Sequence, residues 1–177
     1  MLFWHLGATA AIVFATLGRR RIDYRVVLLG AILPDLIDKP IGRIFFEDRF
    51  QTSRLFGHTF LFVVVSLLSI QLILRGESAR RWFILPIGCL LHLVLDGLWS
   101  DPVTLFWPLF GSTFPPHPTQ DYWLEVLRRP LEHPWVLVQE MFGLGVLLYI
   151  AWAYGLFDRS RLGAFVRSGK LEDVKGG

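Results

Sequence analysis

Residues 82–99 read WFILPIGCLLHLVLDGLW, an almost uninterrupted apolar stretch near the middle of the chain. A membrane-spanning helix needs about 20 predominantly apolar residues, and an irregular backbone cannot face lipid. The stretch therefore favours a transmembrane helix. Its two polar residues, His92 and Asp96, are four positions apart, so they share one face of that helix.

Four further apolar stretches flank this one: Leu2 to Leu17, Ile22 to Asp38, His58 to Leu74, and Pro134 to Phe157. The chain is 53% hydrophobic and contains 7 Trp and 15 Phe, which is too apolar for a soluble domain of 177 residues. We predict an all-α integral membrane bundle of about five transmembrane helices. It occupies residues 1–157, with an outer-face interfacial cap at 100–133, and a basic cytoplasmic tail follows at 158–177.

The second stretch is the weakest span, because Arg25 and Asp35 flank a short apolar centre. We expect its neighbours to shelter it and Pro34 to loosen its last turn. The first stretch has the length of a signal peptide but lacks a positive start, and the arginines 19–21 follow it. It is expected to remain as an uncleaved first helix.

Basic residues predict the orientation in the cytoplasmic membrane. They cluster after the first, third and fifth stretches, which five spans place on one side, and short basic loops are cytoplasmic. The N-terminus, residues 39–57 and the cap then lie outside, although Lys39, Arg43, Arg49 and Arg54 make this asymmetry imperfect.

The net charge of +3 does not indicate a nucleic-acid partner, because the basic residues form short blocks between apolar runs. Membrane lipids are the expected partners, and the oligomeric state is left open. The single cysteine, Cys89, excludes an internal disulfide and is expected to be a small core residue.

Six polar residues of the apolar stretches fall at one predicted depth, the outer ends of the first four helices. They are His5, Asp35, Asp38, His58, His92 and Asp96. A carboxylate at membrane depth costs about 2.5–3.5 kcal/mol, so three of them without a cation would be expensive. Imidazole and carboxylate in equal numbers suit a divalent ion such as zinc, or manganese or iron. Six groups exceed the needs of one tetrahedral ion and would suit two.

Each candidate also has a structural interpretation. An intramembrane histidine such as His5 can serve helix packing or proton transfer. Arg54 is an interfacial charge or a phosphate clamp. Glu140 is a further ligand, a general acid or base, or an interfacial residue, and Asp101 is a weaker candidate in the cap.

Several motifs resemble the YdjM family of membrane-bound metal-dependent hydrolases. They are His5, LPDLID at 33–38, RLFGHT at 54–59, HLVLD at 92–96 and FWP at 106–108. Ser53 and Gly57 stand where the usual third element of the family has His and Thr. The order of ligands is also similar to that of zinc-dependent phospholipase C, which hydrolyses phosphodiesters.

The resemblance implies a hydrolase in which a metal-activated water attacks a phosphoester of a lipid or lipid-linked substrate. Asp38 or Asp96 would act as base, Arg54 would hold the phosphate, and Glu140 is a further candidate for catalysis. The alternatives are a divalent-metal or proton-coupled transporter, and a scaffold in which the metal only joins helices. The nearly apolar inner halves of the helices, such as residues 12–17 and 67–74, favour a one-sided site over a transport path.

Overall fold

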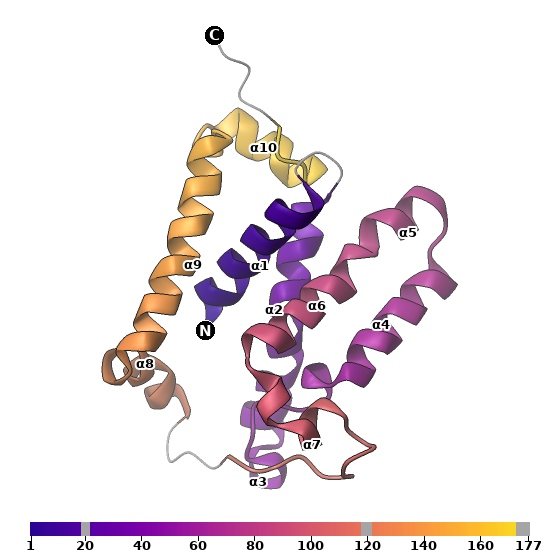
Figure 1. Ribbon diagram of the computed structural model, residues 1–177, viewed down its shortest axis with the longest axis vertical. Coiled ribbons are helices and arrows are strands. Elements are labelled where there is room, and N and C mark those ends of the chain that lie inside the picture. Colours follow the sequence, from indigo (N-terminus) through magenta and orange to yellow (C-terminus); the bar gives the residue numbers. More distant parts are fainter. Residues whose placement is uncertain (19–21, 118–121, 173–177) are drawn as a thin grey trace.

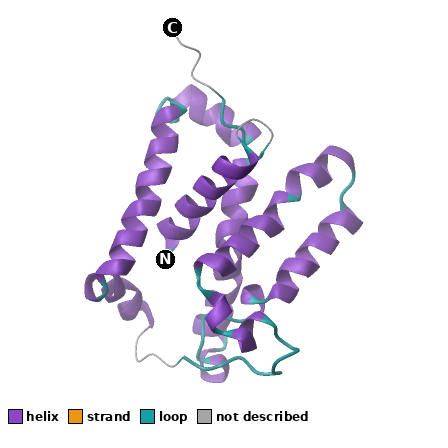
Figure 2. Ribbon diagram, viewed as in Figure 1, coloured by secondary structure: helices purple, strands orange, loops and turns teal. Residues whose placement is uncertain are grey.

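The computed structural model of the chain describes residues 1–18, 22–117 and 122–172, and within these ranges it contains helices and no strand (Figure 2). In chain order the elements are α1 Leu2–Leu17, α2 Tyr24–Pro40, a π-helical turn Ile41–Phe45, α3 Glu47–Phe50, a 3-10 turn Phe56–His58, α4 Phe60–Ile73, α5 Gly76–Trp82, α6 Ile84–Leu95, a 3-10 turn Leu98–Ser100, α7 Pro102–Leu105, α8 Tyr122–Glu132, α9 Pro134–Ala153 and α10 Arg159–Ser168. The all-α prediction is confirmed.

Two helical segments are long and apolar enough to span a membrane. The first is Gly76–Leu95, which comprises α5 and α6, and the second is Pro134–Ala153, which is α9. The apolar helices α1 and α4 are shorter. The predicted number of five spans and the orientation stay predictions. Three segments that they involve, residues 19–21, 118–121 and 173–177, lie outside the described residues.

Helix α2 is the central helix of the bundle and packs against α1 and α6 (Figure 1). Its Val27 and Ala31 are fully buried, as expected for a helix sheltered by its neighbours. The expected loosening at Pro34 is wrong, because α2 continues to Pro40. A proline inside a membrane helix is tolerated where neighbouring groups compensate for the lost hydrogen bond.

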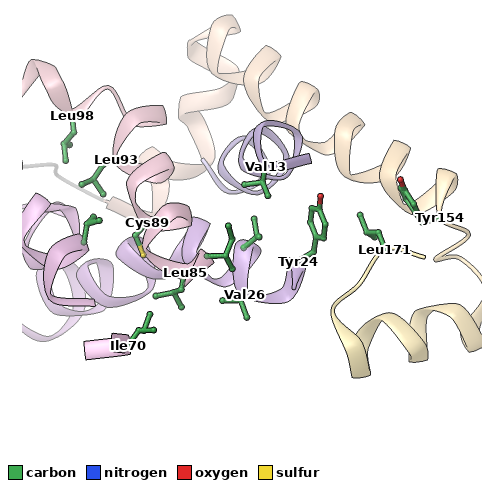
Figure 3. Packing of buried hydrophobic residues seen from close by; sticks show 13 residues of the cluster. Val13, Tyr24, Val26, Ile70, Leu85, Cys89, Leu93, Leu98, Tyr154 and Leu171 are labelled. Atoms are coloured by element: carbon green, nitrogen blue, oxygen red, sulfur yellow. The ribbon is translucent and has the colours of Figure 1, made fainter. Parts of the chain in front are cut away.

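The buried apolar core centres on α1, α2 and α6 and also includes Val63 and Ile70 of α4. Val13 comes from α1, Val26 from α2, and Leu85, Cys89 and Leu93 from α6 (Figure 3). Cys89 is fully buried and free, which confirms its interpretation as a core residue. The core fixes α6 against α2 and thereby sets the positions of the polar residues at the ends of these helices.

Glycines permit the close approach of two helix pairs. A methyl group on Gly143 of α9 would overlap the backbone of Phe3 and Trp4, and one on Gly7 of α1 would overlap the backbone of Gly143. Gly30 of α2 and Gly88 of α6 approach each other in the same way. Small residues at such crossings are typical of membrane helices, whose association depends on packing.

Gly143→Ala should destabilise the protein by about 3 kcal/mol. The added methyl group would overlap backbone atoms, which cannot relieve the overlap by a change of rotamer. Gly145→Ala is the matched control in the same helix, since its methyl group would meet no atom within 4 Å. It should stay within about 1 kcal/mol of the wild type. Thermal unfolding in detergent measures both, and equal stability of the two variants would contradict the α1–α9 packing.

At the end of the bundle remote from α3 and α7, α10 is held against the start of α2 (Figure 1). Arg25 Nη1 donates to the carbonyl of Val166 at 2.6 Å, and the amide of Tyr24 donates to the carbonyl of Gly169 at 2.7 Å. Burial acts to raise the pKa of Asp23, but hydrogen bonds and the charge of Arg25 hold that pKa below its usual value. The predicted tail at 158–177 therefore begins with a docked helix.

Candidate metal centre

Three buried histidines from three elements meet at one end of the bundle. His5 lies in α1, His58 in the 3-10 turn before α4, and His92 in α6, and each is at most 1% exposed. The rings of His5 and His92 are stacked, with centroids 4.1 Å apart. The Nε2 atoms of His58 and His92 are 3.3 Å apart.

Each of the three histidines is oriented by an oxygen at Nδ1. His92 Nδ1 donates to the carbonyl of Ala31 at 2.7 Å, His5 Nδ1 to the carbonyl of Met1, and His58 Nδ1 to Asp38 Oδ2 at 2.7 Å. Because carbonyl and carboxylate oxygens only accept, the proton of each neutral ring is at Nδ1. The three Nε2 atoms therefore present lone pairs, the form in which imidazole binds a metal.

Two carboxylates face these nitrogens. Asp35 Oδ1 lies 3.6 Å from His58 Nε2 and 4.0 Å from His92 Nε2. Asp96 Oδ1 lies 3.0 Å from His5 Nε2, and its Oδ2 lies 3.7 Å from His58 Nε2. His5 Nε2 is nevertheless a buried atom without a hydrogen bond of acceptable geometry in the described residues.

The five groups form two overlapping sets with metal-ligand spacing. One set is His5, His92 and Asp96, and the other is Asp35, His58 and His92; within each set the ligand atoms lie within 4.8 Å of one another. Zinc–nitrogen bonds of about 2.0–2.1 Å place two ligands of a tetrahedral ion about 3.3 Å apart. The separation of the two Nε2 atoms fits this value. With the histidine protons at Nδ1, the five groups turn only lone pairs toward one another, an arrangement that suits a cation. Imidazole and carboxylate ligands suit one or two divalent ions.

Asp38, expected to be a ligand and a base, instead lies behind His58. Its side chain is fully buried, and its oxygens accept the amides of Leu55 at 2.7 Å, Gly57 at 2.9 Å and His58 at 3.0 Å in addition to His58 Nδ1. Asp38 belongs to neither ligand set. It is a positioning residue that fixes the loop before α4 and the ring of His58.

Asp38→Asn should lower zinc affinity by about 10–100-fold, the usual cost of losing an outer-shell partner of a ligating histidine. The amide keeps the shape of the carboxylate but loses its charge and part of its accepting capacity. Zinc titration of the detergent-purified protein measures the change. Asp48→Asn in α3 is the control, because it makes the same substitution at an exposed aspartate that belongs to neither ligand set. Unchanged affinity in Asp38→Asn would contradict the positioning role.

Two basic side chains border the carboxylates. Arg54 Nη2 lies 3.1 Å from Asp96 Oδ2 and 3.3 Å from the Asp96 carbonyl oxygen. Lys39 Nζ lies 2.6 Å from Asp35 Oδ2. Asp35 therefore has one oxygen toward the histidines and the other toward Lys39, whereas Asp96 Oδ2 faces both His58 and Arg54.

The cluster opens into a cavity of about 450 Å³. Asp35, His58, Asp96 and Arg54 line its polar part. Glu140 also lines it, but its Oε2 accepts the Phe3 amide at 2.8 Å, which fixes the start of α1. Asp101 does not line the cavity, and its carboxylate accepts from the amide and hydroxyl of Thr104 in α7.

A family model described as "YdjM inner membrane protein" matches residues 1–162 of the chain. This chain belongs to the YdjM family. The resemblance inferred from the motifs is confirmed, as is the membrane character that the family's description states. Comparisons with curated proteins and with solved structures found no significant match.

The matched range of the YdjM model contains every predicted site residue. The structure brings together the side chains of five predicted ligands, His5, Asp35, His58, His92 and Asp96, with Arg54 beside them. It separates Asp38 from them by the ring of His58, and it places Glu140 in the cavity wall away from the ligand sets.

Sequence reasoning missed some groups at this YdjM-family site. Lys39 follows Asp35 by four residues in α2, and this spacing was a usable signal of the ion pair. The Ala31 carbonyl that orients His92 left no signal in the sequence, because any residue supplies a carbonyl. Glu125 and Arg129 of α8 also line the cavity, and only the tertiary structure brings them there.

Proposed function

We propose that the chain is a metal-dependent hydrolase that cleaves a phosphoester of a membrane lipid or lipid-linked substrate. One observation carries the proposal. The Nε2 atoms of three histidines and two carboxylates converge beside a cavity that Asp35, His58, Asp96 and Arg54 line. This arrangement suits a catalytic metal site better than a structural one. A catalytic site keeps an open position for water or substrate, whereas a structural site is closed by its ligands.

His5, His92 and Asp96 would hold one ion, and Asp35, His58 and His92 would hold a second or share the first. Zinc suits this donor set, and manganese or iron are alternatives. A bound divalent ion supplies a Lewis acid for the phosphoryl oxygen and lowers the pKa of water. The protein residues then orient the substrate and accept protons.

Arg54 is placed to bind the substrate phosphate, because a guanidinium can donate to two phosphate oxygens at once. Asp96 pairs with Arg54 through Oδ2 and would accept the proton from water. Water oxygen bonds to phosphorus, its proton passes to Asp96, the ester P–O bond breaks, and the leaving oxygen takes a proton from solvent.

The test uses purified protein in liposomes containing mixed phospholipids and polyprenyl phosphates, with products followed by mass spectrometry. Zinc-loaded protein should release a phosphorylated or dephosphorylated product. Chelation should stop this release, and readdition of zinc should restore it. The alternative function is divalent-metal transport. If the loaded protein released no product but moved zinc across the same liposomes, the transporter would replace the hydrolase.

A further inference from the structure

Helix α8 is amphipathic, and one of its apolar strips is exposed. Leu124, Leu127 and Leu131 recur at spacings of three and four residues, so they lie on one side of the helix. Leu127 is 72% exposed and Leu131 80% exposed. Arg128 and Glu132 lie beside this strip on the polar side of the helix and are also exposed.

The connection to α9 places α8 at the end of a span. A single residue, His133, separates Glu132 of α8 from Pro134 of α9. Helix α9 is apolar, exposed along most of its surface and 20 residues long. Twenty residues rise about 30 Å, the thickness of the hydrocarbon core, so the start of α9 coincides with the membrane interface. An amphipathic helix attached there lies in the interface with its apolar strip toward the acyl chains.

The other side of α8 forms part of the cavity of the metal centre. Glu125, Val126, Arg129 and Pro130 line that cavity. The apolar wall continues through Leu2 and Phe3 of α1, and both of these side chains are exposed. The cavity therefore has a polar part at the candidate ligands and an apolar part between α1 and α8, lined by Leu2, Phe3 and Val126.

We infer that α8 is seated in the membrane interface and that the gap between α1 and α8 admits a phospholipid-like substrate sideways from the bilayer. The inference rests on the proposed function and names the route and the amphiphilic class of its substrate. The phosphate reaches Arg54 and Asp96, while the acyl part stays against Leu2, Phe3 and Val126. Arg129 contributes a second cation at the rim.

Fluorescence quenching on the full chain tests this inference without metal or turnover. In a Cys89→Ser background, a bimane label is attached at Val126→Cys, Leu127→Cys or Leu131→Cys, with Arg128→Cys and Glu132→Cys as matched controls on the polar side. The vesicles contain phosphatidylcholine brominated on its acyl chains, and aqueous iodide is the second quencher. We expect brominated lipid to quench labels at 126, 127 and 131, and iodide to quench labels at 128 and 132.

Iodide quenching at 127 and 131 without lipid quenching would overturn the interfacial position of α8. Lipid quenching at 127 but not at 126 would overturn the sideways route. These outcomes are separate from the proposed function, because zinc-dependent hydrolysis is measured independently on the unlabelled protein. Hydrolysis without lipid quenching would overturn only the inference. Lipid quenching without hydrolysis would overturn the proposed function and leave only the interfacial position of α8.

Discussion

Protein carrying His92→Ala should lose at least about 100-fold in zinc affinity, because His92 is the residue that both ligand sets share. Loss of an outer-shell partner alone costs about 10–100-fold, and a ligand shared by two sets contributes more. Without His92, His5 and Asp96 remain as one pair and Asp35 and His58 as another. Two protein ligands hold a divalent ion weakly.

Elemental analysis of dialysed, detergent-purified protein measures this loss directly. A thermal shift provides the second measurement: zinc at 1,000 times the wild-type Kd stabilises by about 4 kcal/mol, and a 100-fold weaker site leaves about 1.4 kcal/mol. His133→Ala is the control, because His133 lies between α8 and α9 and belongs to neither ligand set. Full zinc occupancy in the Asp35→Ala, His92→Ala double variant would rule out the ligand set.

Arg54→Ala should separate catalysis from metal binding. Its guanidinium lies 3.1 Å from Asp96 Oδ2, so its removal leaves more negative charge at the site, and zinc should bind as tightly as in the wild type or more tightly. Turnover of the phosphoester should fall by about 10²–10³-fold, the usual effect of removing one donor that stabilises charge in the transition state. Arg54→Lys should restore turnover only in part, since an ammonium cannot grip two oxygens in the geometry of a guanidinium.

The matched control is Arg49→Ala, which removes an exposed arginine of α3 that contacts the ring of Phe50. It should leave both zinc content and turnover unchanged. Turnover in the liposome assay and zinc content from elemental analysis are measured on the same preparations. A parallel fall of zinc and turnover in Arg54→Ala would assign Arg54 to the metal centre and not to the substrate.

The apolar stretches of the sequence predicted five helices, α1, α2, α4, α6 and α9, to within a few residues. The bounds of α1, Leu2–Leu17, are those expected from its apolar run. The expectation at Pro34 was wrong because α2 continues through this proline to Pro40. A membrane helix tolerates a proline where neighbouring groups compensate for the lost hydrogen bond. The predicted stretch at 82–99 also started too far along the chain. The helical segment of the structure begins at Gly76, despite the charges of Arg80 and Arg81.

The sequence by itself determined the all-helical membrane class and six candidate side chains, five of which face one another in the structure. Apolar length and the positions of His and Asp along each helix fix those features locally. Only the tertiary structure decided the role of each group. In it, Asp38 accepts from backbone amides and from His58, three Nε2 atoms point toward one another, and α8 lines the cavity. These features depend on contacts between residues far apart in the chain, and helical spacing alone does not specify which atom of a side chain meets which partner.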